Sequence, residues 1–171
     1  MRPDSWQPHS ELDPFLGRVD DAPLTEENLL LPLVFVAWAD GRIQPHERHL
    51  IQQIARDSEF LPGQTREVLR RWLTDRPTDD EFGHGFRRLV EFLQQRDRAT
   101  EVHGVLRDHL EELCGRVAAS RSSGSPLPVV TDAEADALDD VHALLWMAKT
   151  PSWGQLDAWL DGSIESLSTP V

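Results

Sequence analysis

The sequence has one cysteine, Cys114, no tyrosine and few basic residues. A single cysteine excludes a disulfide framework and a cysteine-rich zinc or iron–sulfur site within one chain. The 17 Lys and Arg residues stand against 30 Asp and Glu residues, which gives a net charge of −13. Because such a surface repels phosphate backbones, we expect protein partners or cations and no nucleic acid.

A long apolar run is also missing. The most apolar stretch, residues 29–38, is about half the length that a membrane-spanning helix needs. The first residues show no signal-peptide pattern. We therefore expect a cytoplasmic protein without a membrane span, and peripheral association with a membrane stays open as an alternative.

Strand-like alternation is rare, and apolar residues recur instead at spacings of three and four. This period indicates helices that each carry one apolar face. With short connections, it predicts an all-α fold, a compact bundle of six or seven helices that begin near residues 25, 45, 64, 79, 100, 132 and 153. We expect one helical domain over residues 25–161, an irregular proline-bearing arm at 1–24 and a frayed tail at 162–171.

Glutamate follows three residues after the capping residue at three of the expected helix starts. The pairs are Gln44 with Glu47, Thr78 with Glu81, and Thr131 with Glu134. Each predicts a glutamate carboxylate that turns back to the cap. In the first helix, Pro32 is tolerated only in the early turns, which favours a helix start later than Thr25. In the helix after Thr78, Gly83 and Gly85 should both weaken the first turns.

Two helix hairpins look alike in sequence. In residues 34–47 and again in residues 113–134, small residues precede a turn, an apolar residue precedes the cap, and a glutamate follows it. The apolar residues are Ile43 and Val130. The pattern predicts a bundle with two pseudo-repeated helix hairpins.

Asp40 lies where the first of these helices should end, and an acid is unfavourable at that end of the helix dipole. If the hairpin is tight, Asp40 and Glu47 share one end of the bundle, and a bound cation would offset their repulsion. The alternative is a plain Asp-Gly turn followed by a capping glutamate. Two carboxylates are also too few for a tight calcium site.

Residues 36–47, VAWADGRIQPHE, resemble the ADG-x-hydrophobic-x-x-x-E signature of the TerB-like family. That family comprises the tellurite-resistance TerB proteins and the N-terminal region of DjlA-type co-chaperones. The resemblance implies an all-helical fold with duplicated hairpins and a divalent cation (Ca²⁺, Mg²⁺ or Zn²⁺) held by acids at the hairpin turns. By family position the metal ligands would be Asp40, Glu47 and Glu134, whereas Ser120 stands where the second acid would be. Asp132 would replace that acid only if the loop folds back.

Three other patterns have two interpretations each. His46 and His49 share a helix face and could ligate zinc, but exposed histidines near a helix start are the simpler reading. The C-terminal helix with Trp153 and Trp159 either binds a partner or covers the bundle. Arginines also form a basic surface that would dock an acidic partner, or they are solvated; they are Arg66, Arg70, Arg71, Arg87 and Arg88.

These observations lead to a non-enzymatic interaction or scaffold domain that binds a divalent cation at Asp40 and Glu47. The TerB-like resemblance adds an association with stress response and with protein assembly near the membrane. Two alternatives remain: a metal-dependent hydrolase, which needs further His and Asp ligands, and a purely structural oligomer subunit held by its C-terminal helix. Cys114, on an apolar helix face, is expected to be a core residue.

Overall fold

The computed structural model describes residues 26–57, 63–99, 105–120, 130–147 and 153–168. In these ranges the chain is helical and contains no strand, which confirms the predicted all-α bundle. The helices are α2 (Glu26–Ala37), α3 (Pro45–Asp57), α4 (Gly63–Trp72), α5 (Asp79–Ala99), α6 (Val105–Ala118), α7 (Asp132–Met147) and α8 (Trp153–Ser168). None of them is long and apolar enough to cross a membrane. The N-terminal arm expected at residues 1–24 lies outside the described residues.

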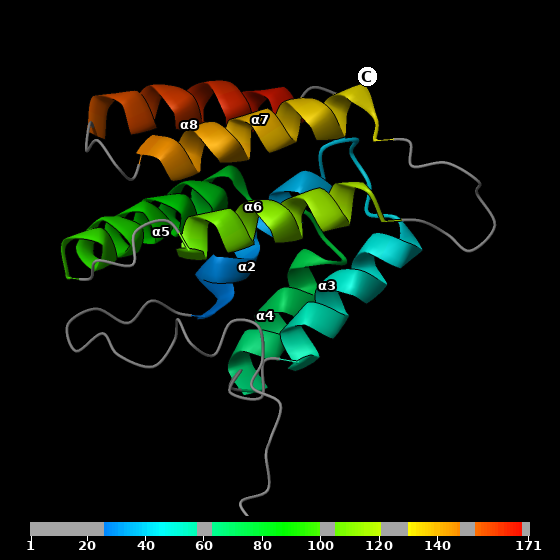
Figure 1. Cartoon of the computed structure of the whole chain (residues 1–171). Coiled ribbons are helices and arrows are strands. Elements are labelled where there is room, and N and C mark those ends of the chain that lie inside the picture. Colours follow the sequence, from blue (N-terminus) through cyan, green and yellow to red (C-terminus); the bar gives the residue numbers. More distant parts are fainter. Residues whose placement is uncertain (1–25, 58–62, 100–104, 121–129, 148–152, 169–171) are drawn as a thin grey trace, which may run out of the picture.

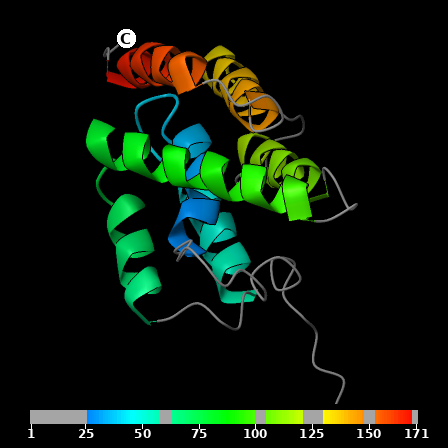
Figure 2. The same cartoon turned by 90° about the vertical axis from the view of Figure 1, so that its left-hand side faces the viewer.

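Helix α2 forms the centre of the bundle, and the other helices surround it (Figures 1 and 2). It packs against α3, α4, α5, α6 and α7. All its residues from 28 to 37 are buried, so it is apolar on every side and not on one face as the sequence spacing suggested. Pro32 lies inside α2, which begins ahead of it at Glu26.

An aromatic cluster fills the space between α2, α5 and α8. Phe35 of α2 meets Phe82 and Phe86 of α5 edge-on, with ring centroids 5.6 and 5.5 Å apart. Trp159 of α8 covers the cluster, and its ring centroid lies 5.3 Å from that of Phe86. These edge-to-face contacts between buried rings tie three helices into one core.

Helix α8 extends further than the sequence suggested. The prediction of a frayed tail from residue 162 is wrong for residues 162–168. Helix α8 continues to Ser168, and Ser163 and Ile164 are buried. Residues 169–171 of that tail lie outside the described part. The apolar side chains Leu156, Leu160 and Ile164 are all buried. Since α8 packs on α5 and α7, it covers the bundle, and this stripe is not presented to a partner.

Two glycines of α5 provide a matched test of helix packing. A Cβ atom at Gly85 would lie 2.3 Å from Cδ2 of Leu31, which is fully buried in α2, so the Leu31 side chain would have to shift within a packed core. A Cβ atom at Gly83 would meet nothing within 4 Å. We expect Gly85→Ala to lower the free energy of unfolding by about 1–3 kcal/mol through overpacking. Gly83→Ala should raise it by about 0.5–1 kcal/mol through helix propensity.

Urea unfolding of the two variants measures both effects. Equal stabilisation by Gly83→Ala and Gly85→Ala would contradict the close approach of α2 and α5.

Candidate functional site

Three helices begin with the same capping arrangement, as the sequence predicted. In α3 the Gln44 N–H donates to Glu47 Oε2 over 2.6 Å, and in α7 the Thr131 N–H donates to Glu134 Oε2 over 2.6 Å. In α5 the Thr78 N–H donates to Glu81 Oε2 over 2.9 Å. Each glutamate therefore satisfies a backbone donor at its own helix start, with its carboxylate held close to the cap.

Two of these three glutamates are buried and meet each other. The side chains of Glu47 and Glu134 are only 2% and 6% exposed, although both carry an ionisable carboxyl group. The two carboxyl groups lie within hydrogen-bonding reach of each other. Figure 1 shows why: the start of α3, the end of α6 and the start of α7 gather at one side of the molecule. We call this the Glu47–Glu134 pair.

Burial is the main cause of an unusual proton affinity at this pair. Loss of solvation raises the pKa of Glu47 to about 8, although the hydrogen bond from the Gln44 N–H acts in the opposite direction. The hydrogen bond to Glu134 and the negative charges of Glu134 and Asp40 are smaller causes that contribute to the same rise. At neutral pH the Glu47 carboxyl group consequently keeps its proton.

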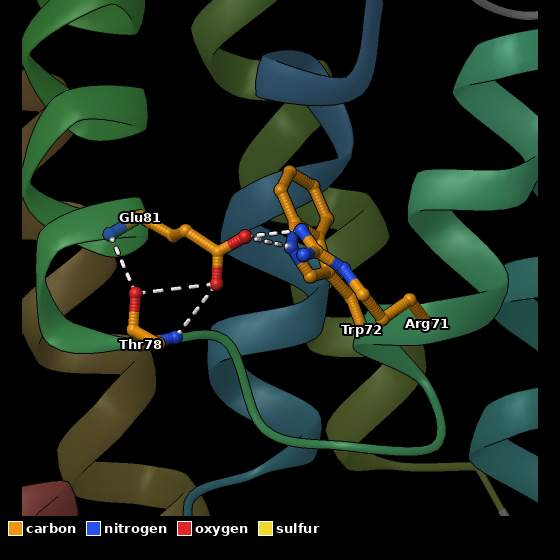
Figure 3. Close-up of polar contacts among 4 residues, drawn as sticks. All are labelled: Arg71, Trp72, Thr78 and Glu81. Carbon is orange, nitrogen blue, oxygen red and sulfur yellow. Dashed lines mark hydrogen bonds and ion pairs between the residues drawn. The ribbon is translucent and has the colours of Figure 1, made fainter.

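The third capping glutamate has the opposite environment. Glu81 Oε1 accepts from Trp72 Nε1 over 3.4 Å and forms an ion pair with Arg71 (Figure 3). Partial burial would raise its pKa, but the hydrogen bonds from Thr78 and Trp72 and the charge of Arg71 outweigh that effect and lower it. The Glu81 carboxylate is thus next to a cation and an indole N–H, whereas the Glu47 carboxyl group is next to a second carboxyl group, that of Glu134.

Asp40 lies near the pair but outside it. Its side chain is exposed, and its Oδ1 accepts the Arg42 N–H over 3.2 Å, as expected of the turn that the sequence also allowed. Gly41 has a φ of 85°, in the left-handed region that a glycine adopts without strain. Asp40 acts on Glu47 through its charge. The predicted neighbour of Glu47 was Asp40, and the structure places Glu134 in that position.

The other expected metal ligands do not join the pair. Within the described ranges, no group of three or more His, Cys, Asp or Glu side chains is arranged to hold a metal ion. His49 and Asp132 are exposed, and the Ser120 hydroxyl is buried without a hydrogen-bond partner among the described residues. The metal-dependent hydrolase considered from the sequence needs several more converging ligands, and the described residues supply none.

Cys114 is fully buried, and loss of solvation raises the pKa of its thiol far above the usual range. A thiol in this state is a core residue and not a nucleophile. The structure therefore agrees with the place that the sequence pattern assigned to it on an apolar face of α6.

The arginines of the expected basic surface are divided among different contacts. Arg71 pairs with Glu81, and Arg87 pairs with Asp157 of α8. Arg66 and Arg70 line a cleft between α3 and α4 together with Arg56. Arg56 was not among the arginines of the predicted surface, because its nearness to α4 arises from helix packing and not from sequence spacing.

Comparisons with protein-family models, curated proteins and solved structures found no match to this chain. The TerB-like resemblance accordingly rests on residues 36–47 and on the helix order predicted from the sequence.

Proposed function

We propose that this chain is a non-enzymatic interaction domain in which a divalent cation binds at the Glu47–Glu134 pair. The observation that carries the cation part is the contact between two buried carboxyl groups from two different helix hairpins. Two such groups cannot both be ionised without a compensating positive charge, and a proton or a metal ion can supply it. The interaction role and its association with stress response come from the TerB-like resemblance.

The donor atoms favour a particular class of cation. Both ligands are carboxylates, and hard cations such as Mg²⁺ and Ca²⁺ take oxygen ligands. One oxygen of each carboxylate, Oε2, already accepts a backbone N–H at its own cap. Mg²⁺ is commonly bound through one or two carboxylates and keeps several waters, whereas Ca²⁺ takes six to eight oxygens and structural zinc takes four ligands, mostly Cys and His. Glu47 and Glu134 would therefore hold Mg²⁺ better than the other two, and Asp40 would add its charge from outside.

The proton on Glu47 competes with the cation for the same site. A carboxyl group must lose its proton before it can ligate a metal ion. Because the pKa of Glu47 is raised to about 8, binding should release about one proton below that pH, and the affinity should weaken about tenfold for each unit by which the pH falls below 8. Above that pH the affinity should level off.

Isothermal titration calorimetry with MgCl₂, CaCl₂ and ZnCl₂ at pH 6.5 and 8.5 tests this proposal. We expect binding with a higher affinity at pH 8.5 than at pH 6.5. At pH 6.5 the measured heat should depend on the ionisation enthalpy of the buffer, because protons are released. Glu47→Gln and Glu134→Gln should abolish it. Asp40→Asn should weaken it only a few-fold, because Asp40 is exposed and its charge is screened.

Glu81→Gln is the matched control, since it changes a glutamate at the same capping position that has no acidic partner. It should leave the titration unchanged. If no cation gives a heat at either pH, or if Glu134→Gln binds as the wild type does, the cation part of the proposal is wrong and the interaction role stands alone.

A further inference from the structure

A cleft opens between α4 and the later turns of α3, away from the first turn of α3 that carries Glu47. Its volume is about 290 Å³, and among the described residues it is lined by Gln52, Ala55, Arg56, Arg66, Leu69 and Arg70. Ala55 and Leu69 are buried side chains of the core, so the cleft has an apolar base. The three arginines are exposed and surround that base with guanidinium groups.

This concentration of positive charge is unusual in a chain with a net charge of −13. Arg70 pairs with Glu67 over 2.7 Å, but both side chains are about 70% exposed, and such pairs contribute little. Arg56 donates from Nε to the Gln52 carbonyl. Within the described part of the chain, neither Arg56 nor Arg66 has a carboxylate partner. Among the described residues, these two guanidinium groups thus have no carboxylate that offsets their charge.

We propose that the cleft between α3 and α4 binds a short acidic peptide segment of a partner protein, with carboxylates on the arginines and an apolar side chain against Ala55 and Leu69. This inference names a partner class for the interaction role proposed above and rests on that role. Arginine clusters recognise acidic motifs because guanidinium groups form paired, charge-assisted hydrogen bonds with carboxylates.

A short peptide fits the charge distribution better than an extended polyanion does. At physiological ionic strength charges are screened over about 8 Å. A peptide confined to the cleft therefore interacts mainly with the three arginines. A nucleic acid or an anionic membrane extends far beyond the cleft and meets the acidic remainder of the surface. The apolar base also favours a ligand that carries apolar side chains beside its charges.

Fluorescence anisotropy with a labelled synthetic peptide of repeated Glu-Glu-Leu units tests this proposal with the full chain. We expect saturable binding that weakens as salt rises. Arg66→Gln should weaken it about fivefold, as expected for one exposed charge pair. Arg56→Gln combined with Arg66→Gln should weaken it more than tenfold. Arg48→Gln, on the same helix α3 but outside the cleft, should stay within twofold of the wild type.

Several results would overturn the proposal. They are the absence of binding to the wild type at about 1 mM peptide, equal binding of a peptide with glutamine in place of glutamate, and equal weakening by Arg48→Gln. Binding of inorganic phosphate at the cleft without binding of the peptide would identify a small-anion site instead. Thermal unfolding of each variant tests whether the fold is intact. We expect no large change, because the altered side chains are exposed.

The test is independent of the cation proposal. Glu47→Gln should bind the peptide as the wild type does, and Arg66→Gln should keep its heat of cation binding. Loss of one property without the other shows which of the two proposals has failed.

Discussion

Glu47→Gln should make the protein more stable than the wild type at pH 8 in metal-free buffer, by about 2–4 kcal/mol. The pKa of Glu47 is raised from an ordinary value of 4.5 to about 8 in the folded protein. Between these two values the unfolded chain releases the proton and the folded chain retains it. The stability of the wild type consequently falls as pH rises through this interval and levels off above it. Glutamine keeps the shape and the acceptor for the Gln44 N–H but does not ionise.

Urea unfolding at pH 5, 6, 7 and 8 in the presence of a chelator measures this effect. The wild type should lose stability across the series, whereas Glu47→Gln should show a much flatter profile. Glu81→Gln is again the control: the pKa of Glu81 is lowered, so its ionised form stabilises the fold and that contribution is lost only as pH falls toward the acidic range. Parallel profiles for the wild type and Glu47→Gln would show that the buried carboxyl group does not titrate as inferred.

Phe35→Ala should lower the free energy of unfolding by about 3–5 kcal/mol. Phe35 is fully buried in the central helix α2, and its ring contacts Phe82, Phe86 and Trp159. Removal of the ring leaves a cavity where α2, α5 and α8 meet, and helix backbones cannot close it without breaking the contacts of the neighbouring rings. For a chain of this size the melting temperature should fall by about 10 °C.

Trp146→Ala is the matched control for the loss of an aromatic side chain. Trp146 is 51% exposed on α7, and its ring meets that of His142 at a centroid distance of 5.8 Å. The substitution should change the free energy of unfolding by about 0.5 kcal/mol or less, as is usual at surface positions. Thermal unfolding followed by circular dichroism compares the two variants. Similar losses in both would contradict the central position of Phe35 in the core.

Helix α2 connects the core around Phe35 with the candidate site at Glu47. Helix α2 carries Phe35, and the turn that follows it, with Asp40, leads into α3 and Glu47. Because α2 packs on α6 and α7 as well as on α3, the same central helix holds α3 near α6 and α7. The Glu47–Glu134 pair is thus a consequence of how α2 is enclosed.

Local features of this protein could be read directly from its residues. The capping glutamates Glu47, Glu81 and Glu134 were predicted correctly because a capping hydrogen bond spans only three residues. The all-α fold followed from apolar spacings of three and four for the same reason, since the helix repeat is short. The position of Cys114 in the core also followed from this period.

Contacts between helices depended on packing that no local pattern records. Glutamates at the same capping position meet different neighbours: Glu81 meets Trp72 and Arg71, while Glu47 meets Glu134. Gly83 and Gly85 look equivalent in the sequence, but a side chain is excluded only where α2 approaches Gly85. Arg56 joins Arg66 and Arg70 across the α3–α4 cleft for the same reason. The energy of a buried charge or a close contact is set by the atoms opposite it, and those atoms belong to segments remote in the chain.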